Sequence, residues 1–211
     1  MRQIMVTACL VAILAPTRRK DDIMYRVLAI ALTVTTTLAC AEPRDTGRDI
    51  AAVEAEAKAL VQQFVGQLKP QLQQAIAEGG PGQATAVCAN IAPALMDELS
   101  ASSGWSVRRV SLQPRNTERA IPDAWEREVL ERLSAQQAAG TPAQTLDYGR
   151  KVEGRYRYMQ AQGVEPVCLM CHGTDLSEPV QQAIAEYYPE DRATGYSLGE
   201  VRGAISLTDL R

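Results

Sequence analysis

The sequence predicts an α+β domain with an antiparallel sheet and a long N-terminal helix. Two observations lead to this fold class. Apolar residues recur every three or four positions through the first half of the chain, which is the period of helices that pack on one side. Later segments alternate apolar and polar residues over short stretches, which is the period of half-buried strands. Because the helices come first and the strands follow mixed with short helices, an α+β arrangement is favoured over regular βαβ units.

Two helices are expected before the first strand. The first follows apolar positions across residues 50–76, where Pro70 is expected to kink or split it, and Gly79-Gly80-Pro81-Gly82 ends it. The second covers about residues 83–102. Its apolar stripe holds Ala84, Cys88, Ile91, Leu95 and Leu99. Cys88 is therefore expected to point inward with the aliphatic side chains.

The second half of the chain is expected to hold strands with intervening helices. The predicted strands are residues 105–113, a pair between 144 and 162, and a final strand at 201–207, and the predicted helices are 122–137 and 177–187. In the second strand of the pair, Tyr156 and Tyr158 are expected on one face, with Arg157 and Met159 on the other. Ser177 is expected to cap the last helix.

Residues 1–41 are expected to be a leader for export. Two apolar runs within this segment are each shorter than the ~20 residues that a membrane-spanning helix needs. Met24 precedes the second run and is followed by a basic residue, so Met24 is a candidate true start. Ala39-Cys40-Ala41 fits simple cleavage, and Cys40 also resembles an acylated lipoprotein cysteine. Residues 42–211 are therefore predicted to form a single periplasmic domain, held at a membrane only if Cys40 is lipidated.

The overall charge gives no indication of a nucleic-acid partner. The chain has 22 basic and 25 acidic residues and a formal net charge of -3, without the strongly basic balance that such binding favours. Removal of the leader leaves three cysteines, Cys88, Cys168 and Cys171. An odd number of cysteines in an exported protein argues against a purely disulfide framework.

One motif carries recognisable chemistry. Cys168-Leu169-Met170-Cys171-His172 is C-x-x-C-H, the attachment pattern of c-type haem. Two thiols at this spacing can form thioethers to the vinyl groups on one porphyrin edge, and the adjacent histidine, the only one in the chain, then reaches the iron. Two alternatives remain open. A disulfide between Cys168 and Cys171 would leave His172 unexplained. A zinc site made of Cys88, Cys168, Cys171 and His172 would use a known ligand set but lacks a second C-x-x-C.

The opposite face of the iron has no second histidine to bind it. The sulfur donors that remain after the leader and the two attachment cysteines are Cys88, Met96, Met159 and Met170. Met170 lies inside the attachment loop, Met96 falls outside the apolar stripe of its helix, and Met159 lies on a charged strand face. Cys88 is the best candidate from the residues alone, and a small buried hydrophobic residue explains it equally well.

Several segments together are more specific than the C-x-x-C-H motif. They are Ala84-Thr85-Ala86-Val87-Cys88, residues 103–109, 122–126, 157–159, 168–173, 188–196 and 201–204. Across residues 53–207 they resemble a family of bacterial c-type haem domains with a PAS-like fold. The resemblance implies a PAS-like antiparallel sheet flanked by helices, one covalent haem c, and axial ligation by His172 and Cys88. Residues 115–119 depart from the family's Arg-Asn-Pro loop, so that loop's contacts are not carried over.

The implied ligands lead to two functional hypotheses. A thiolate ligand favours ferric iron, and on reduction Cys88 can protonate and leave, which would open a position for a small gas ligand. The first hypothesis is therefore a mono-haem cytochrome that senses redox state or gas and signals through a partner protein that the sequence does not identify. The alternative is a simple periplasmic electron carrier with a redox partner. Enzymatic activity is not expected, because the only histidine is used by iron and no Ser/His/Asp or paired-carboxylate group stands out.

Other residues have mostly structural interpretations. Trp105 and Trp125 are expected to be core or haem-packing groups. The arginines that could pair with haem propionates are Arg108, Arg109, Arg155 and Arg157. Solvated strand faces explain these arginines nearly as well.

Overall fold

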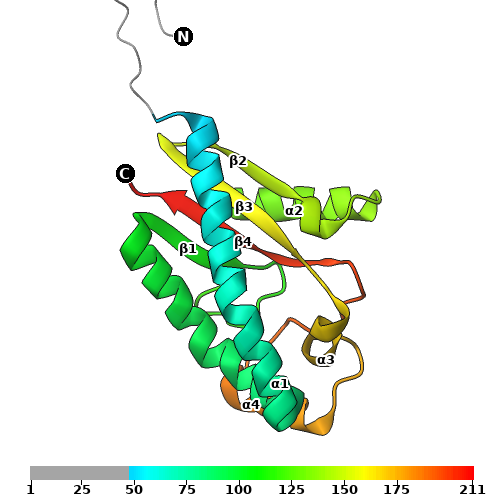
Figure 1. Cartoon of the computed structure of the whole chain (residues 1–211). Coiled ribbons are helices and arrows are strands. Elements are labelled where there is room, and N and C mark those ends of the chain that lie inside the picture. The colour runs from blue at the N-terminus through cyan, green and yellow to red at the C-terminus, as the bar shows by residue number, and fades with distance from the viewer. Residues whose placement is uncertain (1–47) are drawn as a thin grey trace, which may run out of the picture. The chain divides into compact units, whose positions relative to one another are not determined.

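The computed structural model describes residues 48–211 (Figure 1). The predictions for the leader, including Met24 as the start and cleavage or acylation at Cys40, lie outside the described residues. Among the helices of residues 48–211, none combines the length and apolar character needed to cross a lipid bilayer.

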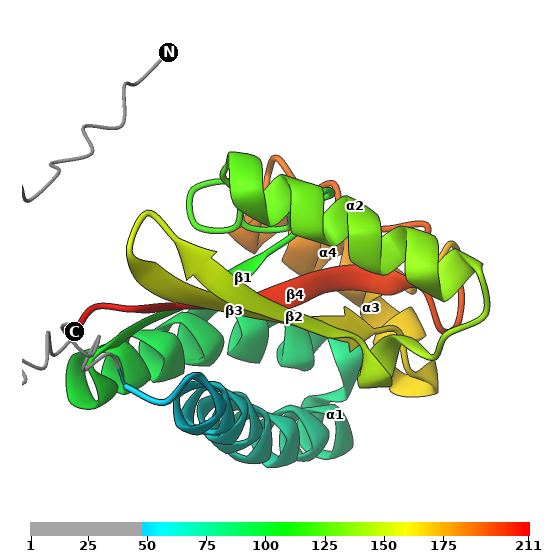
Figure 2. The same cartoon turned by 90° about the horizontal axis from the view of Figure 1, so that it is seen from above.

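A four-stranded antiparallel sheet lies between two helical layers (Figure 2). The strands are β1 (Trp105–Val110), β2 (Asp147–Val152), β3 (Arg155–Gly163) and β4 (Val201–Asp209), in the spatial order β1-β4-β3-β2. The long helix α1 (Ile50–Ser103) covers one face of the sheet and α2 (Ala124–Ala138) covers the other. The predicted α+β class, with an antiparallel sheet flanked by helices and a long N-terminal helix, is confirmed.

Helix α1 consists of two arms that fold back on each other (Figure 1). The break is at Gly80, whose φ of 76° and ψ of -176° are accessible to glycine but costly for other residues. Pro81 follows directly and favours the start of the second arm. The two predicted helices are therefore present. Pro70 lies inside the first arm and does not split it, because Gly80 is the residue with non-helical dihedral angles.

The sheet separates two apolar cores, as the alternation in β3 predicts. Tyr156 and Tyr158 pack with α1, whereas Met159 is fully buried in the core beneath α2. The interpretation of Met159 as part of a charged face is wrong, because α2 covers that face. Arg157 on the same face places its guanidinium 4.3 Å from the centre of the Trp125 ring.

Met96 also differs from the prediction. Its side chain is 6% exposed and belongs to the core between α1 and the sheet. The second arm of α1 packs against both the first arm and β1, so its buried sector is wider than the single apolar stripe seen in the sequence.

Three short elements complete the domain at the end of the sheet near Gly80. They are the 3₁₀ turn η2 (Pro166–Cys168), the one-turn helix α3 (Leu169–His172) and helix α4 (Glu178–Tyr187), and a further 3₁₀ turn, η1 (Ala143–Thr145), precedes β2. Helix α4 packs Val180, Ile184 and Tyr188 against the second arm of α1 near Ala89. Ser177 precedes α4 as predicted, but its side chain makes no capping hydrogen bond.

Candidate functional site

The C-x-x-C-H residues form a compact double turn directly after β3. Pro166 opens η2, which suits proline because the first residue of a helical turn needs no N–H donor inside it. Helix α3 follows and ends at Gly173, whose N–H donates to the Leu169 carbonyl at 3.0 Å. A Cβ atom at Gly173 would lie 2.6 Å from that oxygen, so the close of the turn requires glycine. The motif is therefore held by its own backbone.

The two cysteines of the motif face different neighbours. Cys168 packs with Val164, Ala193 and Tyr196. Cys171 Sγ donates to the Pro81 carbonyl at 3.6 Å and lies 3.9 Å from Thr85 Oγ1, so it contacts the start of the second arm of α1. Burial raises the pKa of both thiols. Redox-active C-x-x-C pairs depend on a lowered thiol pKa, so these surroundings do not favour a disulfide oxidoreductase.

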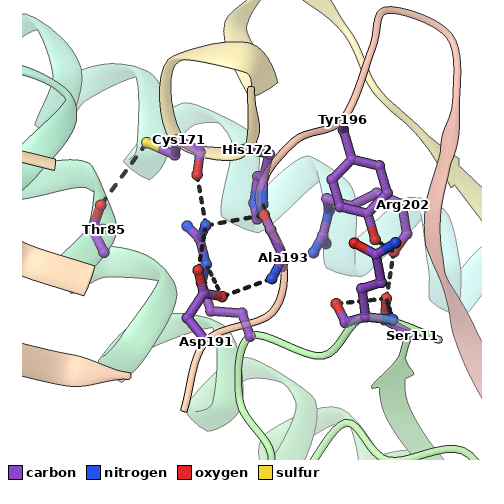
Figure 3. Close-up of polar contacts among 10 residues, drawn as sticks. Thr85, Ser111, Cys171, His172, Asp191, Ala193, Tyr196 and Arg202 are labelled. Atoms are coloured by element: carbon purple, nitrogen blue, oxygen red, sulfur yellow. Dashed lines mark hydrogen bonds and ion pairs between the residues drawn. The ribbon is translucent and has the colours of Figure 1, made fainter. Parts of the chain in front are cut away.

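His172 is fixed through its Nδ1 atom. Nδ1 lies 2.6 Å from the Ala193 carbonyl, and because a carbonyl only accepts, Nδ1 carries the proton and donates it (Figure 3). The ring packs edge-on against Tyr196, with 6.4 Å between the ring centres. Burial, together with the positive charge of Arg115, lowers the pKa of His172 to about 3. The imidazole is therefore neutral, and Nε2 keeps the lone pair that a metal ion binds.

Arg115 ties the motif to the loop after α4. Its Nη2 donates to the carbonyl of Cys171 at 2.6 Å and to that of Ala193 at 3.1 Å, the same oxygen that accepts from His172. Its Nε donates to Asp191 Oδ1 at 3.0 Å. The Arg115 and Asp191 side chains are 8% and 7% exposed. Sequence reasoning missed this role: Asp191 falls in a segment that carries the family resemblance, but Arg115 lies in the 115–119 loop, which departs from the family pattern.

The four predicted site residues come together at one large cavity. Cys88, Cys168, Cys171 and His172 all line an open cavity of about 270 Å³ between the first arm of α1, the sheet and the motif. Much of its wall is apolar and is supplied by Val61, Phe64, Leu68, Leu72, Ile76 and Ile205. Cys88 is half-buried there, on the second arm of α1. An apolar cavity with a few polar groups in its wall is the usual form of a cofactor site.

A second cavity of about 80 Å³ adjoins the first. Cys88, Arg109, Arg115, His172 and Arg202 line both cavities. The second cavity extends toward the C-terminal part of α1, where Met96 and Pro93 line it. The two candidate iron ligands therefore border both cavities.

The other candidate residues are distributed unevenly. Met159 lies in the core under α2, and Met170 is 39% exposed and lines neither cavity. Among the arginines proposed from the sequence, Arg109 lines both cavities and Arg108 the smaller one. Arg155 is exposed at the β2–β3 turn, and Arg157 pairs with Asp123 and Glu126 at the start of α2, so neither lies at the cavities. Trp105 and Trp125 are core residues, as predicted.

The alternatives to haem find little support in the geometry. In residues 48–211, no three His, Cys, Asp or Glu side chains are grouped so that they could hold a metal ion, so the zinc shell suggested by the sequence is not formed. No disulfide joins Cys88, Cys168 and Cys171. The residues present fit haem instead, because two thiols, a neutral imidazole with a free Nε2 and an apolar wall face one cavity.

Comparison with known proteins gives two results. The sequence pattern of the Tll0287-like family matches residues 43–208. Among solved structures, the chain is similar to the crystal structure of the cyanobacterial heme-protein Tll0287, with 27% sequence identity and a TM-score of 0.55. That alignment covers 75% of this chain and 92% of the cyanobacterial chain. The search of curated proteins returned no match.

Proposed function

Because the chain belongs to the Tll0287-like family, we propose that it is a haem protein that holds one covalent haem c. In this proposal Cys168 and Cys171 attach the haem. Each S–H adds across one vinyl C=C bond, so a thioether forms and no atom is lost. His172 would bind the iron through Nε2, and Cys88 would supply the second protein ligand. The observation that carries the proposal is that these four residues, which lie up to 84 positions apart (88 to 172), line one cavity.

The surrounding residues prepare His172 for this role. The Nδ1–H bond to Ala193 fixes the tautomer and the ring orientation, and such a hydrogen bond also raises the donor strength of the free nitrogen. Arg115 donates to the same carbonyl and so withdraws part of that electron density. A bound haem supplies one-electron redox chemistry and a coordination site, and these contacts set how strongly His172 donates to it.

We propose redox or gas sensing as the role of the haem. A thiolate from Cys88 stabilises ferric iron, and its protonation and departure on reduction would free one coordination position. The smaller cavity borders both Cys88 and His172 and would offer room for the released side chain and for a small gas ligand. The signal would pass to a partner protein, and the role is not enzymatic. The export segment expected from the sequence would place the domain in the periplasm.

Simple electron transfer is the second candidate, and one observation favours it. The buried Arg115–Asp191 pair holds the motif and His172 firmly in place. Electron carriers depend on ligands that move little between oxidation states, and a fixed ligand pair would suit that role. The behaviour of Cys88 in the ferrous state therefore separates the two functions.

The covalent haem is tested by a pyridine haemochrome spectrum and an intact mass of protein matured with a c-type haem assembly system. The expected result is a c-type spectrum and a mass increase of one haem. Cys168→Ala and Cys171→Ala should each leave a single thioether. Colourless wild-type protein with free thiols would refute the proposal.

The distal ligand is tested with Cys88→Ala and a matched sulfur variant. The ferric absorption spectrum should change clearly in Cys88→Ala, because a thiolate ligand is lost. Met96→Leu is the control, since Met96 lines the adjoining cavity and its loss should leave the spectrum unchanged. An unchanged ferric spectrum in Cys88→Ala eliminates Cys88 as a ligand. Rapid CO or NO binding by the ferrous wild type favours sensing, and an inert ferrous protein favours electron transfer.

A further inference from the structure

Two arginines on the walls shared by the cavities, Arg109 and Arg202, have no acidic partner within residues 48–211. Arg109 Nε donates to Gln162 Oε1 at 3.0 Å, and Arg202 Nη2 donates to the same oxygen at 3.3 Å. Neither guanidinium forms an ion pair with a carboxylate of residues 48–211. The two positively charged guanidinium groups therefore share one neutral acceptor, Gln162 Oε1, and repel each other in a partly buried setting.

Each of the other arginine and lysine side chains on these walls lies within ion-pair distance of a carboxylate. The pairs are Lys69 with Glu165, Arg108 with Glu126, Arg115 with Asp191 and Arg119 with Asp97. The uncompensated positive charge of the cavity walls therefore comes from Arg109 and Arg202. Charged side chains that are partly buried in a cavity wall are normally paired with an opposite charge, so an anion would be stabilised between Arg109 and Arg202.

The sheet brings the two arginines and the glutamine together. Gln162 on β3 lies opposite Gly203 on β4, and Arg109 lies on β1 at the other side of β4. A Cβ atom at Gly203 would lie 2.4 Å from the Val110 carbonyl, so glycine lets β1 approach closely here. The Arg202 carbonyl accepts hydrogen bonds from Ser111 Oγ at 2.6 Å and from the Tyr196 hydroxyl at 3.2 Å (Figure 3).

We propose that Arg109 and Arg202 together bind one carboxylate group in the cavity, with Gln162 holding the two guanidinium groups toward each other. Each guanidinium uses one N–H on Gln162 and keeps the rest of its planar donor fork, which matches the two oxygens of a carboxylate. The carboxylate has two sources. One is a propionate of the haem, and this source rests on the proposed function. The other is a free carboxylate that enters the cavity.

The test compares Arg109→Gln and Arg202→Gln with Arg119→Gln in haem-loaded protein. Arg119 is the matched control because it lines the smaller cavity but pairs with the exposed Asp97. If a propionate is bound, the propionate bending band in the resonance Raman spectrum should shift, and the reduction potential should fall, in both cavity variants and not in the control. The conservative Arg109→Lys variant keeps the charge without the fork and should give an intermediate band shift.

A titration of wild-type protein with acetate and succinate at constant ionic strength tests the free source. A saturable change in the haem spectrum or the thermal midpoint, with an affinity weaker by about tenfold or more in either cavity variant, assigns the site to a free carboxylate. No Raman shift together with no saturable titration overturns the proposal. Wild-type protein without covalent haem refutes the proposed function separately, and the titration of the same material still decides whether the two arginines bind a carboxylate.

Discussion

Replacement of Arg115 by methionine should destabilise the domain strongly. Methionine keeps much of the side-chain volume but removes the guanidinium that bonds Asp191 and the carbonyls of Cys171 and Ala193. The Asp191 carboxylate would then be buried without a cation. Loss of one member of a buried ion pair costs about 3–5 kcal/mol, and loss of the donor to the Cys171 carbonyl adds on the order of 1 kcal/mol where water does not replace it, whereas the Ala193 carbonyl keeps the His172 Nδ1–H. The expected loss for Arg115→Met is therefore at least about 3 kcal/mol.

Urea unfolding followed by circular dichroism measures this loss as a lower midpoint at unchanged slope. Arg119→Met is the matched control, because the Arg119–Asp97 pair has side chains 44% and 61% exposed and should contribute about 0–1 kcal/mol. The double variant Arg115→Met with Asp191→Asn should be more stable than Arg115→Met alone, since it removes the unpaired charge. A loss in Arg115→Met no larger than in Arg119→Met would refute the assignment of Arg115 as the buried anchor of the motif.

Two further predictions concern backbone fit and pH. Gly203→Ala should cost about 1–3 kcal/mol, because the new Cβ would lie 2.4 Å from the Val110 carbonyl, whereas Gly66→Ala has open space and should stabilise α1 by about 0.5–1 kcal/mol. Equal effects in urea melts would contradict this. The second prediction concerns the pKa of Asp123. Burial alone would raise this pKa, but the hydrogen bond from the Glu126 N–H and the paired Arg157 guanidinium hold it below its usual value. The ionised Asp123 carboxylate therefore stabilises the fold above the unfolded pKa of 3.8, and this contribution is lost as the pH falls through the lower folded pKa. Asp123→Asn should flatten the curve of unfolding free energy against pH in this acidic range. A curve as steep as that of the wild type would refute the prediction.

The order and type of the elements could be predicted from the sequence because their periods differ. The break near Gly80, the strand at Trp105 and the hairpin before the motif all follow from local signals. The family resemblance is also confirmed. The positions of Met96 and Met159 could not be predicted, because each depends on which element covers a face. That is a tertiary property, and the polar residues beside Met159 hid it.

The candidate site shows the same division. The C-x-x-C-H motif is local, so its chemistry is visible in the sequence. Arg115 and Asp191 lie 76 positions apart, and no spacing rule links an arginine in a loop to an aspartate after a helix. Arg109 stood out from the sequence as one of several strand arginines, but its lack of a carboxylate partner appears only in the folded chain. Partner choice among charged residues is therefore the part of the site that needs the structure.

The reversal of α1 at Gly80 is what makes Cys88 available to the site. In a continuous helix, the residues after Gly80 would run on away from the motif at 1.5 Å per residue. The reversal instead brings Pro81 and Thr85 against Cys171, and Cys88 follows one turn later on the same arm. Cys171 is an attachment residue in the proposal. Its contact with Pro81 and Thr85 therefore also fixes the position of Cys88 along the wall of the cavity. Gly80 and Cys88 are thus separated by about two turns of the second arm, and a change in the angle between the arms would move Cys88 relative to the motif.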